Sequence, residues 1–133
     1  MLSEKTYLKI MRGSAIYDLV VTSGFATPFT FALGWGHLTA LHTKLNLAGE
    51  VPQAGLYLTF MASLMGSVVV IWSLARLKIN RAVLGRFDGA GRALFSAWMV
   101  WALSQGASGL IYFLLVPEVA WMVVQFLPYR KAA

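Results

Sequence analysis

The stretch "FLLVPEVAWMVVQFLP", residues 113–128, decides between two folds for this chain. It is apolar enough to form a helix inside a bilayer, yet Pro117 and Glu118 lie in its middle. Proline followed by an acidic residue is a pattern typical of a helix start. Within a continuous helix, the same pair would place a carboxylate at membrane depth. The rest of the sequence bears on which interpretation holds.

The composition is that of a membrane protein. Of the 133 residues, 59% are hydrophobic and 12% are charged, and the mean hydropathy is +0.68. Soluble domains carry about twice that charged fraction. The chain has no cysteine, which excludes disulfides, thiolate metal sites and thiol nucleophiles. Its length predicts a single transmembrane helical domain, residues 1–133.

The formal net charge of +6 arises from basic residues that lie between apolar segments. Nucleic-acid binding needs a basic face on a soluble surface, so we expect no nucleic-acid partner. The basic residues instead indicate topology, because cytoplasmic segments of membrane proteins are rich in lysine and arginine. With four spans, every lysine and arginine except Lys44 lies on one side. This predicts a multi-pass protein of a bacterial inner membrane, with both termini in the cytoplasm.

Four apolar segments are predicted to span the membrane: residues 14–36, 54–75, 90–105 and 109–127. The first precedes a polar exported segment, residues 37–53, and the second contains no charged residue. A basic loop, residues 76–92, leads to the last two, which are joined by a turn at "SQGASG", residues 104–109. We therefore predict an all-α integral membrane protein that folds as a four-helix transmembrane bundle. The alternative is a long helix over residues 93–116 as the third span, followed by a C-terminal interfacial helix that starts at Pro117.

Asp18 and Glu118 are candidate ligand-binding residues, because a carboxylate at membrane depth costs about 2.5 kcal/mol or more and usually has a partner. For Asp18, the competing interpretation is a solvent-exposed ion pair with Arg76 or Arg92 at the inner surface. For Glu118, we expect a side chain that faces the bundle interior. We also expect it to be partly protonated at neutral pH, because no basic residue is predicted at its depth. The helix start remains the alternative for Glu118.

Further ligand-binding candidates are Trp98, Trp121, Thr22 and Thr27. The two tryptophans lie deep in predicted spans and could line a pocket for a flat apolar or cationic ligand, or simply pack. The two threonines lie near Pro28, where they could favour a kink and close helix packing, or a polar pathway. A second close helix contact is predicted at residues 62–66 of "MASLMGS", a small-xxx-small pattern.

Neither metal nor phosphate motifs are present. His37 and His42 are five residues apart, a spacing that matches no strong metal motif, so no metal site is predicted. The segment "GRFDGAGR", residues 85–92, lacks the lysine and hydroxyl residue of a phosphate-binding loop. Asp88 is instead predicted to cap the third span, with Arg86 and Arg92 contacting lipid phosphates.

Three segments, "YDLVVTSGFATPFTF", "LMGSVVVIWSLARL" and "GRFDGAGR", resemble the DoxX-like group of small four-helix bacterial membrane proteins. The resemblance covers nearly the whole chain and implies the same four-helix layout. DoxX is associated with a thiosulfate:quinone oxidoreductase, and wider relatives of the layout bind or isomerise sterols and isoprenoids with buried carboxylates. The resemblance therefore implies quinone as the cofactor to consider, although no catalytic motif maps onto this chain residue by residue.

We expect a small non-enzymatic membrane protein that binds a lipid-like molecule or serves as a subunit of a membrane complex, with a homo-oligomer as one such assembly. The lipid bilayer is its predicted partner. Two alternatives stay open. One is a quinone- or isoprenoid-linked enzyme or redox subunit that uses Glu118 and Asp18, and the other is a small transporter.

Overall fold

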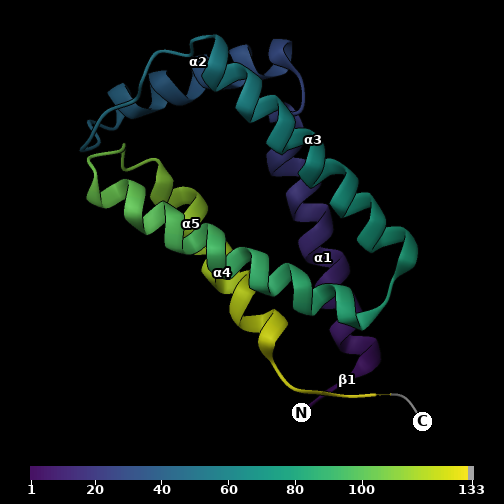
Figure 1. The fold of residues 1–133 in the computed structure, drawn as a ribbon. Helices are drawn as coiled ribbons and strands as arrows, with labels where there is room; N and C mark the ends of the chain where they lie inside the picture. Colours follow the sequence, from purple (N-terminus) through teal and green to yellow (C-terminus); the bar gives the residue numbers. More distant parts are fainter. Residues whose placement is uncertain (132–133) are drawn as a thin grey trace.

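The computed structural model describes residues 1–131 and is mainly helical, which confirms the all-α prediction (Figure 1). The short strands β1 (Leu2–Ser3) and β2 (Tyr129–Arg130) pair in parallel, so the two ends of the chain lie side by side. Between them follow the helices α1 (Glu4–Thr22), α2 (Pro28–Lys44), α3 (Leu56–Ile79), α4 (Ala82–Ser104) and α5 (Ile111–Phe126), with the 3-10 turn η1 (Ser23–Phe25) after α1.

The first predicted span is broken. α1 ends at Thr22, and α2 begins at Pro28 with a bend of 96° between the two helices. Proline is tolerated in the first helical turn because its missing N–H has no partner to lose there. Thr27 caps the new helix by accepting a hydrogen bond from the Thr30 amide at 3.1 Å. The prediction of one straight helix over residues 14–36 is therefore wrong, and the predicted polar loop is helical as far as Lys44.

α3 corresponds to the second predicted span and is long and apolar enough to cross a membrane. It ends at Asn80, whose left-handed backbone (φ 50°) breaks the helix. Only Asn80 and Arg81 separate α3 from α4, so the predicted basic loop over residues 76–92 is wrong. Arg76 and Arg92 lie inside helices instead.

α4 and α5 form the predicted hairpin, and the single long helix over residues 93–116 is excluded. Pro117 lies inside α5, so the interpretation of Pro117 and Glu118 as a helix start is wrong. The hairpin turn contacts the segment between α2 and α3, as the Glu50 amide donates to the Gly106 carbonyl at 3.0 Å. Gly49 is required at this contact, because its φ is +84° and a Cβ would lie 2.3 Å from the Ala107 carbonyl oxygen.

The helices form two pairs that meet near the chain termini (Figure 1). α1 packs on α3, α4 packs on α5, and α2 lies across the opposite end, where it contacts α3. Among the described residues, α3 alone passes the test for a membrane-spanning helix, and α1 with α2 passes only as a bent pair. The four-span bundle is therefore supported only in its helical composition.

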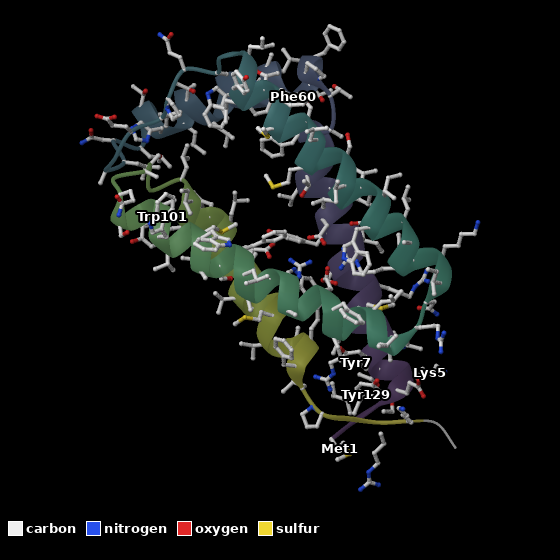
Figure 2. All side chains as sticks on the ribbon, in the orientation of Figure 1. Met1, Lys5, Tyr7, Phe60, Trp101 and Tyr129 are labelled. Carbon is white, nitrogen blue, oxygen red and sulfur yellow. The ribbon has the colours of Figure 1, made fainter. Side chains whose placement is uncertain are left out.

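The interior is polar and the surface is apolar. Phe29 and Leu56 are each 84% exposed, and many other large hydrophobic side chains also lie on the surface. Figure 2 shows nitrogen and oxygen atoms gathered between the α1/α3 pair and the α4/α5 pair. The buried polar and charged side chains are Ser14, Asp18, Ser73, Arg76, Asp88, Arg92, Ser96, Ser108 and Gln125. A soluble fold has the opposite distribution, because charged side chains are rarely buried and extended apolar surfaces are rarely exposed.

The small-xxx-small prediction for α3 is confirmed by its packing. Gly66 lies against η1, and a Cβ at this position would approach the Phe25 backbone to 2.5 Å. We expect Gly66→Ala to lower the thermal unfolding temperature, because overpacking a close contact costs about 1–3 kcal/mol. Gly34→Ala is the matched control, since nothing lies within 4 Å of its Cβ position in α2. Equal unfolding temperatures for the two variants would contradict the close contact between α3 and η1.

Candidate functional site: a buried charge cluster

Five charged side chains from four helices meet in the interior, and we call them the charge cluster. α1 supplies one carboxylate, α3 one guanidinium, α4 one of each and α5 one carboxylate. The most exposed side chain among them is only 12% accessible. The cluster consists of Asp18, Arg76, Asp88, Arg92 and Glu118.

Asp18 lies between the two arginines and joins the helix pairs. Both of its carboxylate oxygens accept from Arg92 Nη2, at 2.8 and 2.7 Å, and Oδ2 also accepts from Arg76 Nη2. The predicted pairing of Asp18 with Arg76 or Arg92 is confirmed for both residues. The predicted solvent exposure of the pair is wrong, because the Arg76 side chain is 0% and the Arg92 side chain 3% accessible.

Asp88 is a second acceptor at the centre of the cluster. Its Oδ2 accepts from Arg92 Nε at 2.9 Å and from Gln125 Nε2 at 2.8 Å, and it lies 2.6 Å from Arg76 Nη1. Its Oδ1 accepts from Trp72 Nε1 at 2.8 Å. The prediction that Asp88 caps the third span is wrong, because α4 begins at Ala82 and Asp88 is buried within it.

Ser14 and Ser73 accept further hydrogen bonds from the two terminal nitrogens of Arg76. Ser14 Oγ donates to the Met11 carbonyl and accepts from Arg76 Nη1 at 3.0 Å and from Gln125 Nε2 at 2.7 Å. Ser73 Oγ accepts from Arg76 Nη2 at 3.0 Å. These hydroxyl groups replace water around a fully buried charge, which limits the cost of burying it.

Glu118 extends the cluster toward the rest of α5. Its Oε1 accepts from Arg92 Nη1 at 2.7 Å, so the expectation that no basic residue lies at its depth is wrong. Its Oε2 is buried and has no hydrogen-bond partner. Ser96 Oγ, one helical turn after Arg92 on α4, and Gln125 Oε1 are also buried without a partner. The site therefore contains acceptor groups that the chain itself leaves unsatisfied.

The cluster carries unequal numbers of opposite charges. Three carboxylates, those of Asp18, Asp88 and Glu118, meet only two guanidinium groups. With all five groups ionised, the net charge is −1. An uncompensated buried charge is costly, so a proton or a bound cation stabilises this arrangement.

Arg86 links the site to the chain termini. It donates to the carbonyl oxygens of Gln125 at 3.0 Å and Leu127 at 2.8 Å, and its guanidinium lies 5.2 Å from the ring centroids of both Tyr7 and Tyr129. The rings of Tyr7 and Tyr129 stack with centroids 4.3 Å apart. Figure 2 labels both residues near the chain ends. Arg86 thus holds the last turn of α5, and its contact with lipid phosphates stays a prediction.

The lipid-phosphate prediction is wrong for Arg92, whose side chain is 3% accessible and buried among carboxylates. Of the remaining candidates, Trp121 packs its ring against that of Tyr17, with centroids 6.0 Å apart. Trp98 is 63% exposed, Thr27 caps α2, and Thr22 is the last residue of α1.

The histidines have local partners. His42 Nδ1 lies 2.6 Å from Ser108 Oγ, and His37 Nδ1 lies 2.7 Å from the Leu33 carbonyl oxygen. Within residues 1–131, no three histidine or carboxylate side chains are placed to hold a metal ion.

No family model, curated protein or solved structure matches this chain. The resemblance to the DoxX-like group accordingly stays a prediction from the sequence, and the function must be argued from the charge cluster and its surroundings.

We expect Asp18→Asn to destabilise the protein by about 3 kcal/mol, because it removes the carboxylate that both buried guanidinium groups contact. Asp18 accepts from both arginines, so the amide would direct its N–H₂ donors at guanidinium groups. Thermal unfolding in detergent measures the effect. Glu50→Gln, in the exposed segment between α2 and α3, is the control and should unfold like the wild type. An unfolding temperature for Asp18→Asn equal to that of the control would contradict a buried pair.

Proposed function

We propose that this chain is a multi-pass protein of a bacterial inner membrane that binds a lipid-like molecule at Glu118. α1, α3, α4 and α5 are its spans, and both termini lie in the cytoplasm. The observation that carries the proposal is the buried carboxylate oxygen of Glu118 without a partner, inside a polar interior that is enclosed by an apolar surface.

The helix lengths support a membrane location. At 1.5 Å per residue, the 19 residues of α1 extend about 28 Å and the 24 residues of α3 about 36 Å. The hydrocarbon core of a bilayer is about 30 Å thick. An apolar surface is stable in lipid, whereas in water its exposed side chains would favour aggregation. A polar interior is also compatible with lipid, because charged residues in membrane proteins face the bundle and pair there.

The distribution of exposed basic residues supports the cytoplasmic orientation. The strand pairing brings both ends of the chain together, and Asn80 and Arg81 join α3 to α4 near the same end (Figure 1). Exposed lysines and arginines at this end include Lys5, Lys9, Arg12, Lys78, Arg81, Arg130 and Lys131. Lys44 lies at the opposite end, as the positive-inside rule requires for an exported segment.

The chemistry of the site favours a hydrogen-bond donor in the ligand. Ionised Glu118 offers Oε2 as an acceptor, and Gln125 Oε1 is a second unsatisfied acceptor. A quinone carbonyl is itself an acceptor and cannot satisfy these oxygens unless the carboxyl is protonated. Binding of a lipid-like molecule with a donor group is thus better supported than quinone chemistry.

Topology is testable because the chain contains no native cysteine. The single variants Arg130→Cys and Arg81→Cys should be protected from a membrane-impermeant thiol reagent that is added to intact cells. Both should react after the membrane is permeabilised. Cysteines at Lys44 and Gln53 should react in intact cells. Labelling of position 130 in intact cells would contradict the four-span arrangement.

Ligand binding is testable by native mass spectrometry of protein that is extracted gently from membranes. We expect a copurifying lipid-like molecule with the wild type and its loss with Glu118→Gln, because the amide presents a donor where Oε2 accepts. The folding of this variant should be retained, since the amide oxygen can still accept from Arg92. Glu50→Gln controls for the loss of a glutamate and should keep the molecule. A wild-type protein without any bound molecule, or a molecule retained by Glu118→Gln, would contradict the proposal.

A further inference from the structure

We infer that the polar head of the bound molecule is a protonated amine, held by Glu118 Oε2. This inference rests on the proposed function, because it assigns the chemical class of ligand to the same site. Three observations carry the inference: the charge balance of the cluster, the hydrogen bonds that its arginines already make, and the aromatic rings of Tyr17 and Trp121.

With all five groups ionised, the charge balance favours a cation over a neutral donor. Three carboxylates face two guanidinium groups, and a single positive charge makes the cluster neutral. A neutral hydroxyl group would satisfy the hydrogen bond of Oε2 but leave the net charge of −1 buried. An ammonium group supplies both the missing charge and three N–H donors.

An anionic head group does not fit the site, because the guanidinium donors already bind carboxylates. Each guanidinium nitrogen of Arg92 donates to a carboxylate oxygen. Arg76 has one nitrogen without a partner, Nε, but its side chain is 0% accessible. A phosphate or carboxylate would find no free charged donor here and would add a second negative charge to the excess. The atoms without a partner include two oxygens that only accept, Glu118 Oε2 and Gln125 Oε1, and the hydroxyl group of Ser96.

Aromatic rings on α1 and α5 favour the same head group. Tyr17 precedes Asp18 in α1, and Trp121 lies one turn after Glu118 in α5. Their ring centroids lie 6.0 Å apart, with an interplanar angle of 47°. Aromatic faces attract ammonium groups, most strongly where water is excluded. A carboxylate flanked by these rings is therefore suited to a cationic head with an apolar tail.

The inference predicts a direction of pH dependence. Glu118 is faced by Arg92 and Asp88 from α4 and by Asp18 and Tyr17 from α1, with Arg76 of α3 behind Asp18. Without a ligand, a proton can balance the excess charge, so proton and ammonium compete for the same carboxylate. An alkylamine stays protonated below about pH 10, as a lysine side chain does. Its affinity should therefore fall as the pH is lowered.

The experiment uses the full chain in nanodiscs of phosphatidylcholine and three probes that share one apolar tail: dodecylamine, dodecanol and dodecanoate. Binding is measured by calorimetry on the wild type, on Glu118→Gln and on Glu50→Gln, so that partitioning of the probes into lipid is subtracted. We expect dodecylamine to bind the wild type and Glu50→Gln at least about tenfold more tightly than it binds Glu118→Gln. We expect dodecanol and dodecanoate to bind at least about tenfold more weakly than dodecylamine. Amine affinity should decrease as the pH is lowered, because protons compete with the ammonium group for the same carboxylate.

Each result decides between the inference and the proposed function. Dodecanol or dodecanoate binding as tightly as the amine in a Glu118-dependent manner would overturn the inference and leave the proposed function intact. Amine affinity that rises as the pH falls would also overturn it. If each of the three probes binds the wild type and Glu118→Gln with equal affinity, the inference and the proposed function are both contradicted. If Glu118→Gln does not fold, the ranking of the probes and the pH profile of the wild type still decide.

Discussion

The arginine–carboxylate contacts between α1, α3 and α4 are the interaction on which the rest of the structure depends. Asp18 on α1 accepts from Arg76 on α3 and from Arg92 on α4, so one carboxylate joins both helix pairs. Few apolar side chains are buried, so the usual hydrophobic contribution to folding is small. In the proposed bilayer that contribution would be small in any case, because lipid tails are as apolar as the helices. Polar contacts must then hold the helices together.

This dependence explains why the serines, Gln125 and Trp72 surround the cluster. A buried ion pair stabilises only when its remaining donors and acceptors are also satisfied. Most of the polar atoms in the cluster meet this condition, and Glu118 Oε2 does not. The unpaired oxygen belongs to Glu118 on α5, one turn before Trp121, whereas both oxygens of Asp18 accept hydrogen bonds. The structure thus separates a structural part of the cluster from a part suited to a ligand.

The sequence predicted the helical class, the α3 span, the α4/α5 hairpin and the pairing of Asp18 with arginine. These rest on long apolar runs, on a Gly-containing turn and on the cost of a carboxylate at depth. It did not predict the bend after Thr22, because an apolar run does not show whether it forms one helix or two helices at an angle. Thr27 and Pro28 fit a kink within one helix as well as the start of a second helix. It also placed Arg92 and Asp88 in a loop, because glycines and charges in "GRFDGAGR" are typical of turns. The i, i+4 spacing of Asp88 and Arg92 was the available sign that both lie on one helix face.

The central claim is that Asp18 and Arg92 interact directly and away from water, and a double-mutant cycle tests it most directly. The free energies of unfolding of the wild type, Asp18→Asn, Arg92→Gln and the double variant give the coupling between the two side chains. Residues in contact within one ionic network couple by about 0.5–3 kcal/mol, and their burial predicts a value in the upper half of that range. Additive effects, with a coupling below about 0.3 kcal/mol, would show that the two side chains do not interact and would contradict the buried cluster.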